Sequence, residues 1–275
     1  MTLSRSSRQR DPGIVDHSSG RLTRAVALVK QLGPAEILRR IRQGGLSGSY
    51  AFIARNLRHQ IAHARARAFD RKEGVDTSGS IQLDGLDVTG PNRALGNEAV
   101  STSPKSFRWL LAQAPLPAGA TFIDIGCGKG RTVLLASAKF GRSVGVEFAR
   151  ELVATARSNI ASYRDRHPKA GEMRVVRKDA ADFVFPPGPM VIYLYNPFDE
   201  SLLRKVLANL KNSLSAAPRP CLLIYVTGKG TIAWATRSVA EMGALNEIKR
   251  GRVPAFSDAI RPLDFAIYAG GSAAS

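Results

Sequence analysis

Cysteine and histidine are scarce in this chain, and each shortage excludes a class of chemistry. The sequence holds 2 cysteines and 4 histidines among 275 residues. Two cysteines do not make the disulfide framework of a small secreted domain. Cys127 and Cys221 both stand in apolar, strand-like stretches, where a free thiol behaves as a small hydrophobic residue. His59 and His63 share one face of a predicted helix, but no third ligand stands near them in the sequence, so no metal site is predicted.

Long apolar runs are also missing. No stretch approaches the ~18 consecutive apolar residues of a membrane-spanning helix, and we predict no transmembrane segment. The N-terminus lacks the ordered basic, apolar and cleavage regions of a secretory signal. These absences favour a reducing, cytoplasmic location.

Acidic residues are few, and the imbalance of charge is uneven along the chain. The 22 Asp and Glu residues face 40 Lys and Arg residues, which gives a net charge of +18. Residues 1–73 hold 15 basic and 5 acidic residues and so carry +10. We expect residues 21–73 to contact nucleic acid, an anionic membrane surface or an acidic protein. The alternative is a solubilising segment that only water contacts.

Glycine and proline divide the chain into a helical part and an alternating part. Residues 21–70 contain three predicted helices, separated at Gly33-Pro34 and Gly44-Gly45. The predicted organisation is a disordered tail over 1–20, a basic helical segment over 21–75, one α/β domain over 76–270 and a disordered tail over 271–275.

From about Pro104, short apolar runs alternate with helical stretches. We predict strands over Thr121–Ile125, Ser143–Glu147, Arg174–Arg177, Met190–Tyr195, Cys221–Val226, Leu245–Ile248 and Leu263–Ala269. We predict helices over Arg131–Phe140, Arg150–Arg166, Glu200–Leu214 and Thr231–Met242. Helices of this length between strands indicate parallel crossovers and a sheet covered on both faces. The last two strands have no helix between them, which predicts a final hairpin with one antiparallel strand.

A glycine-rich turn follows the first of these strands, in the run FIDIGCGKGR at residues 122–131. Glycines let the backbone turn sharply and let a ligand approach without a Cβ in the way. Free amides at the start of the next helix favour a carboxylate or phosphate. The spacing departs from the dinucleotide fingerprint, because Arg131 stands where its third glycine belongs. Asp124 fits poorly with pyrophosphate and well with a ligand that carries an ammonium and a sulfonium.

Acidic residues end the next two strands. Glu147 can accept hydrogen bonds from both hydroxyls of a ribose in the crevice beyond the strand ends; an ordinary acid at a helix N-terminus is the alternative. Asp179 can accept from an adenine amino group while the amide of Ala180 meets a ring nitrogen. Asp182 is the rival of Asp179, or a cap of the short segment that follows.

A polar and aromatic turn, Tyr195-Asn196-Pro197-Phe198, follows the fourth strand. One interpretation makes Asn196 a helix N-cap and Pro197 the first helical residue. The other places the turn over a reacting methyl group, with the Asn196 oxygen accepting from a substrate amine. Tyr195 or Phe198 would then face a cationic sulfonium. The two interpretations are compatible.

In this order along the chain, these features resemble class I S-adenosylmethionine (SAM)-dependent methyltransferases, over roughly residues 100–270. The resemblance implies a Rossmann-like, mostly parallel sheet of seven strands, with helices on both faces, after the basic helical segment. It implies SAM as the cofactor, bound by Asp124, Gly126, Cys127, Gly128, Gly130, Glu147, Asp179, Ala180 and Asn196. It implies a catalytic turn made of Tyr195, Asn196, Pro197 and Phe198.

The wider sequence is similar to narrower groups of methyltransferases. Residues 69–72 and 74–79, together with the Asn196 turn, resemble an uncharacterised bacterial subgroup. The loop ending Gly130-Arg131 resembles the seven-strand protein-lysine methyltransferases. The turn is similar to the Asn/Asp-Pro-Pro-aromatic motif of amine-methylating enzymes but has one proline fewer. These likenesses imply an amine acceptor, such as a protein lysine. The alternatives are a nucleic-acid or small-metabolite acceptor, or a non-catalytic module that binds nucleic acid or membrane through its basic segment.

Overall fold

The computed structural model describes residues 59–81, 99–228, 232–256 and 262–271. The chain divides into two units, 1–58 and 59–275, and every described residue belongs to the second. The predicted tail over 1–20 and most of the basic segment over 21–75 therefore lie outside the described residues. Residues 59–73 are helical.

At the C-terminus, Gly271 is the one described residue of the predicted tail 271–275. Among the described residues, none of the helices has the length and apolar character required to cross a bilayer.

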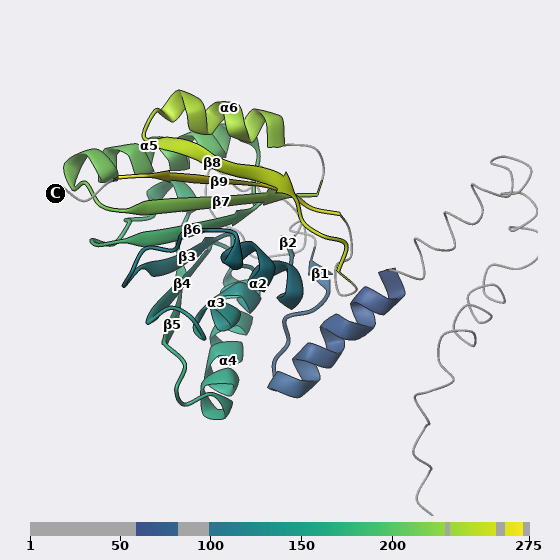
Figure 1. Cartoon of the computed structure of the whole chain (residues 1–275). Helices are drawn as coiled ribbons and strands as arrows, with labels where there is room; N and C mark the ends of the chain where they lie inside the picture. Colours follow the sequence, from purple (N-terminus) through teal and green to yellow (C-terminus); the bar gives the residue numbers. More distant parts are fainter. Residues whose placement is uncertain (1–58, 82–98, 229–231, 257–261, 272–275) are drawn as a thin grey trace, which may run out of the picture. The chain divides into compact units, whose positions relative to one another are not determined.

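A seven-stranded sheet in the order β5-β4-β3-β6-β7-β9-β8 forms the centre of the described unit (Figure 1). Its strands are β3 (Thr121–Ile125), β4 (Arg142–Glu147), β5 (Glu172–Arg177), β6 (Met190–Tyr195), β7 (Cys221–Thr227), β8 (Leu245–Arg252) and β9 (Asp264–Gly270). The strands from β5 to β7 pair in parallel. Strand β9 is antiparallel to both of its neighbours, β7 and β8. The sheet is therefore mixed, and the predicted final hairpin with one antiparallel strand is confirmed.

Burial explains which strands the sequence predicted well. Every residue of β3 and β7 is buried, as expected for strands covered on both faces, and such strands appear as continuous apolar runs. Strand β8 lies at the sheet edge and is exposed beyond Leu245. It extends past the predicted end at Ile248 through charged residues such as Lys249 and Arg250, which suit an edge strand that must not pair with another chain.

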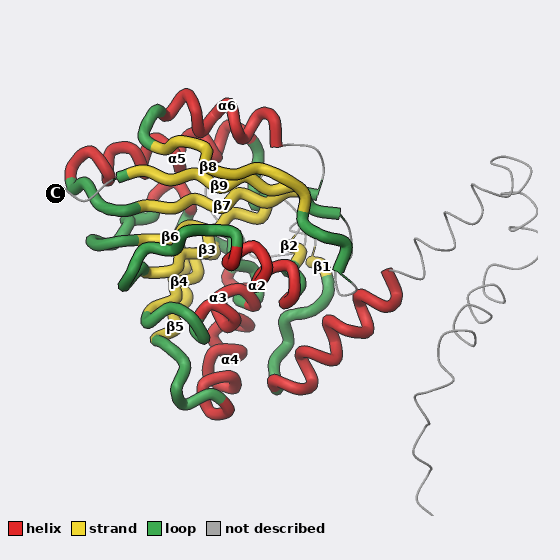
Figure 2. Tube along the Cα trace, in the orientation of Figure 1, coloured by secondary structure: helices red, strands yellow, loops and turns green. Residues whose placement is uncertain are grey.

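Helices cover both faces of the sheet (Figures 1 and 2). They are α2 (Pro104–Ala112), α3 (Arg131–Ala136), α4 (Arg150–Arg166), α5 (Glu200–Ala216) and α6 (Ile232–Met242). One apolar cluster joins α5 and α6 to the sheet. Separate clusters join α2, α3 and α4 to it. Helix α3 ends before the predicted Phe140, where the Ser137 hydroxyl donates to the Leu134 carbonyl over 2.7 Å.

A second, two-stranded sheet was not predicted. Strand β1 (Ser80–Ile81) pairs antiparallel with β2 (Ala99–Val100). Strands of two residues carry no recognisable period, so the sequence shows only a connecting stretch there.

Candidate functional site

The predicted site residues gather at one edge of the sheet. Asp124 lies near the end of β3, Glu147 ends β4, Asp179 follows β5 and Asn196 follows β6. These strands are parallel neighbours, so their carboxyl ends meet at the same edge. Open α/β sheets bind ligands in the crevice beyond that edge.

The glycine loop takes a backbone conformation that requires glycine. Gly126, Gly128 and Gly130 have φ angles of +81°, +53° and +84°, in the region that side chains disfavour. The amides of Gly126 and Cys127 both donate to the Val146 carbonyl, over 2.9 and 3.1 Å. These bonds fold the loop back onto the end of β4.

Glu147 lies directly against this loop. One carboxylate oxygen accepts from the Gly128 amide over 3.0 Å. The other accepts from the amides of Phe148 and Ala149, over 2.8 and 3.0 Å. Burial raises the pKa of Glu147, and the three amide hydrogen bonds oppose that rise. The side chain is thus held against the glycine loop at the carboxyl end of β4.

Asp124 is a second buried carboxylate at the same edge. It is 4% exposed and accepts a hydrogen bond from the Thr132 hydroxyl at the start of α3. Burial raises its pKa to about 7, the Thr132 bond opposes the shift, and the charge of Glu147 adds to it. Two acids in one dry site are costly without a cation, so the pair suits a positively charged ligand.

Cys127 is buried in the apolar cluster that joins α3 and α4 to the sheet. Its sulfur lies 2.6 Å from the position that a Cβ on Gly145 would take, so the loop packs tightly on β4. Burial raises the pKa of the Cys127 thiol well above its usual range. A protonated, buried thiol is not a nucleophile.

Asn196 has a φ of +40° and is the one non-glycine residue with positive φ among those described. Strained backbone of this kind concentrates at functional sites. Its side-chain oxygen accepts from the Tyr225 hydroxyl over 3.2 Å. The next residue, Pro197, packs on the glycine loop: a Cβ built on Gly126 would lie 2.5 Å from the Pro197 Cβ.

The helix after this turn begins later than one interpretation of the sequence held. The N-cap of α5 is Asp199, whose side chain accepts from the Leu202 amide over 2.9 Å, and the helix starts at Glu200. The N-cap role considered for Asn196 is therefore wrong, because Asp199 occupies the capping position three residues later. Phe198 is buried in the core cluster beside α5, and Tyr195 is half-buried.

Asp179 caps the short helix η3 (Ala180–Asp182) by accepting from the Ala181 amide over 2.9 Å. Asp182, considered as a cap of the segment that follows it, is instead the exposed last residue of η3. The Lys178 amide donates to the Glu147 carbonyl over 3.0 Å and ties the end of β5 to that of β4.

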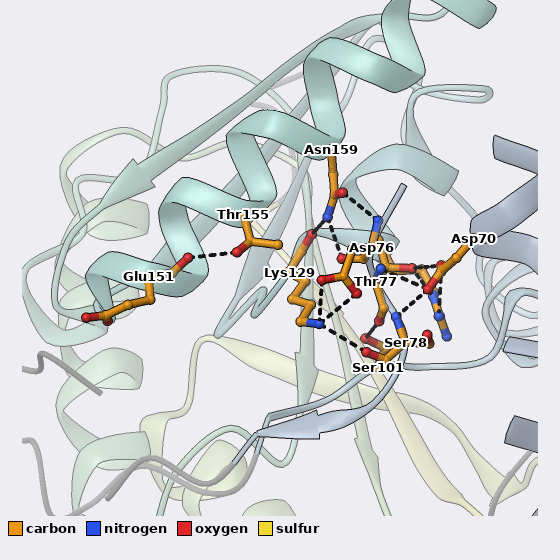
Figure 3. Close-up of polar contacts among 10 residues, drawn as sticks. Asp70, Asp76, Thr77, Ser78, Ser101, Lys129, Glu151, Thr155 and Asn159 are labelled. Atoms are coloured by element: carbon orange, nitrogen blue, oxygen red, sulfur yellow. Dashed lines mark hydrogen bonds and ion pairs between the residues drawn. The ribbon is translucent and has the colours of Figure 1, made fainter. Parts of the chain in front are cut away.

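A polar network beside the glycine loop was not predicted. Lys129 and Arg131, which flank Gly130, form hydrogen bonds with residues between Asp70 and Ser78. Figure 3 shows the bonds of Lys129. The partners are more than fifty positions apart in the sequence, so helix or strand periodicity cannot indicate that they are in contact. The resemblance of residues 69–72 and 74–79 to a group of methyltransferases is the one feature of the sequence that pointed to this segment.

A comparison with protein families identifies the domain that contains this site. A family model described as a methyltransferase domain matches residues 122–216, from β3 to the end of α5. This span contains the glycine loop, both buried acids and the Asn196 turn. This part of the chain is a SAM-dependent methyltransferase domain. The predicted cofactor, SAM, is confirmed with it.

The methyltransferase is similar to solved structures at low identity. N-methyltransferase NodS from Bradyrhizobium japonicum, with bound S-adenosyl-L-homocysteine, is 15% identical with a TM-score of 0.42, over 60% of this chain and 84% of NodS. Magnesium protoporphyrin IX methyltransferase from Synechocystis, with bound SAM, is 15% identical with a TM-score of 0.46, over 78% and 97%. Cyclopropane synthase MmaA2 from Mycobacterium tuberculosis is 14% identical with a TM-score of 0.48, over 68% and 95%. No curated protein sequence matches the methyltransferase significantly.

Proposed function

We propose that this methyltransferase transfers the methyl group of SAM to an amine nitrogen, and that protein lysine is the acceptor. The observation that carries the proposal is the Asn196 turn, strained at φ +40° and packed through Pro197 on the glycine loop. A side-chain amide oxygen held at this place can accept a hydrogen bond from an acceptor N–H.

The chain's residues fit SAM at this edge. The glycine loop would lie along the aminoacyl end, with the Asp124 carboxylate as the counter-charge of its ammonium. The Glu147 carboxylate accepts three amide hydrogen bonds and has a lone pair left for a ribose hydroxyl. Asp179 and the Ala180 amide would meet the adenine.

The reaction needs alignment more than chemical activation. When bound, SAM supplies a methyl group on a sulfonium, which is already a good leaving group. The acceptor nitrogen must be neutral, and the half-buried surroundings of Tyr195 and Asn196 favour the neutral amine. The nitrogen attacks in line, the N–C bond forms as the S–C bond breaks, and the proton released from nitrogen passes to water. Asn196 would hold the nitrogen on that line.

A contact with an anionic partner is a second proposal, for the basic N-terminal segment. On the described helix 59–73, Arg65, Arg67 and Arg71 are exposed. Arg67 and Arg71 line an open cavity of about 570 Å³ together with Ser162 on α4, and the acidic residues Asp70 and Asp76 line it too. Guanidinium and hydroxyl groups suit a phosphate, so this face supports contact with nucleic acid. The absence of salt-sensitive RNA binding by the full chain would contradict it.

Isotope transfer tests the proposed reaction. The full chain is incubated with methyl-labelled SAM and bacterial cell extract, which is then separated into protein, RNA, lipid and small molecules. The expected result is base-stable label in protein that releases methyl-lysine on acid hydrolysis. Label in RNA or in a small metabolite would contradict the lysine acceptor, and base-labile label would contradict nitrogen. The Gly128→Arg variant, whose side chain would fill the loop, is the inactive control.

The buried free thiols Cys127 and Cys221 support a reducing compartment such as the cytoplasm for this activity.

A further inference from the structure

The segment from Asp70 to Ser78, called the strap below, is bonded to the glycine loop through Lys129. The ammonium of Lys129 donates to both carboxylate oxygens of Asp76, over 2.8 and 3.0 Å. It also donates to the Ser78 carbonyl over 3.1 Å. In Figure 3 the Lys129 side chain reaches from the loop to lie between Asp76 and Ser78. The loop's one long flexible side chain is therefore held by the strap.

Asn159 of α4 joins the backbones of the strap and the loop. Its side-chain oxygen accepts from the Asp76 amide over 2.8 Å, and its side-chain nitrogen donates to the Asp76 carbonyl over 2.8 Å. The same nitrogen donates to the Lys129 carbonyl over 3.0 Å. One buried amide group thus fixes the spacing between the two segments.

A buried charged cluster forms the second anchor. The Arg131 guanidinium donates to the Thr77 hydroxyl over 2.7 Å and to the Asp70 carboxylate over 3.3 Å. Asp70 also accepts from the amides of Thr77 and Ser78, over 3.0 and 2.6 Å. Arg131 is 3% exposed and Asp70 is 7% exposed, so each depends on the other to compensate its buried charge.

These contacts add to those that the loop makes with the end of β4, at the Val146 carbonyl and the Glu147 carboxylate. Three of the five residues from Gly126 to Gly130 are glycines, which contribute no side chain and are conformationally permissive. The strap bonds the two long side chains on either side of Gly130, and Asn159 bonds the backbone between them. A loop whose shape is fixed before binding loses less entropy when a ligand binds.

We propose that Asp70, Asp76 and Thr77 are positioning residues of the cofactor site, which hold the glycine loop in its SAM-binding conformation. The N-terminal strap is then part of the cofactor site and not only a linker to the basic segment. This inference rests on SAM as the cofactor, and it does not depend on which acceptor is methylated.

The ion pair of Asp76 with Lys129 gives the cleaner test, because the Asp76 side chain is 68% exposed and that of Lys129 is 15% exposed, whereas Asp70 and Arg131 are both buried. The full chains carrying Asp76→Asn, Lys129→Gln and both changes are compared with wild type by calorimetric titration with SAM and by thermal unfolding. We expect each single change to raise the Kd for SAM about threefold to tenfold. Because both changes break the same ion pair, the Kd of the double variant should be no higher than that of the weaker-binding single variant. Arg142→Gln is the matched control: it breaks an exposed ion pair with Glu172 at the opposite end of the strands.

The buried anchor is tested with a conservative pair at Thr77. Thr77→Val keeps the shape and removes the hydroxyl that joins Arg131 to Asp70, whereas Thr77→Ser keeps the hydroxyl. We expect Thr77→Val to weaken SAM binding about tenfold and Thr77→Ser to stay within about twofold of wild type. A lower Tm with an unchanged Kd, in Thr77→Val and in both single changes of the ion pair, would overturn the proposal and leave the strap a purely structural element. Failure of amine methylation in the isotope experiment would leave these Kd values unaffected.

Discussion

Pro197 fills the space where a side chain on Gly126 would begin. The two residues belong to loops after different strands, β6 and β3, yet a Cβ built on Gly126 would lie 2.5 Å from the Pro197 Cβ. The contact joins the cofactor loop to the turn that we propose holds the acceptor. A change at either residue must therefore be felt at both.

Gly126→Ala tests this contact. The substitution adds a methyl group that overlaps the proline ring, at a φ of +81° that alanine disfavours. We expect a loss of about 2–4 kcal/mol of unfolding free energy and the loss of SAM binding, measured by chemical denaturation and calorimetry. Gly119→Ala is the control, since its φ is +66° but nothing lies within 4 Å of the added Cβ. If Gly126→Ala and Gly119→Ala lowered the free energy of unfolding equally, the contact with Pro197 would contribute nothing to the effect.

Glu147→Gln tests the anchor of the glycine loop. The glutamine side chain has one acceptor oxygen, whereas both oxygens of the Glu147 carboxylate accept from backbone amides. The NH₂ group of the glutamine would therefore face a backbone N–H, and that hydrogen bond would be lost. We expect the Kd for SAM to rise about tenfold to a hundredfold, the range for a charge-assisted hydrogen bond. The exposed Glu151 at the start of α4 gives the control variant Glu151→Gln. Unchanged SAM binding in Glu147→Gln would exclude the ribose role.

Asp124 predicts how SAM binding depends on pH. Its pKa is raised to about 7, so the carboxylate becomes ionised as the pH rises through neutrality. The ionised form attracts the SAM ammonium, and we expect tighter binding at pH 8 than at pH 6. Titrations across this range should show the trend in wild type and a flat profile in Asp124→Asn. Weaker binding at the higher pH in wild type would contradict the assignment.

The same pKa shift predicts stability with the opposite sign. The folded protein holds the Asp124 proton up to a pH of about 7, whereas the unfolded chain releases it near 3.8. Asp124 therefore lowers the free energy of unfolding as the pH rises between these values. We expect Asp124→Asn to be more stable than wild type by about 1–3 kcal/mol at pH 8 while it binds SAM less well. Equal stability at pH 8 would mean that the buried charge costs nothing.

Asn196→Gly separates the acceptor site from the cofactor site. Glycine accepts the φ of +40° without strain but removes the oxygen that Tyr225 donates to. We expect kcat to fall about a hundredfold with the Kd for SAM unchanged, measured with the acceptor that the isotope experiment identifies. Tyr225→Phe should lower kcat less, because the Asn196 oxygen remains. A rise in the Kd for SAM with normal kcat would move Asn196 into the cofactor site.

Sequence periodicity determined the main elements because their burial is regular. Strands β3 and β6 and helix α4 have the predicted bounds, Thr121–Ile125, Met190–Tyr195 and Arg150–Arg166. The glycine loop and Glu147 were also predictable, since a strand end, a turn and an acid each leave a local signature. Because the strands pair in parallel, the residues at their carboxyl ends lie at the same edge of the sheet.

Contacts between residues far apart in the chain could be known only from the folded protein. The pairing of Asp70 with Arg131, the contact of Pro197 with Gly126 and the positive φ of Asn196 follow from how whole elements pack. Local propensity and period do not encode such contacts, because each depends on the positions of two segments and not on either sequence alone.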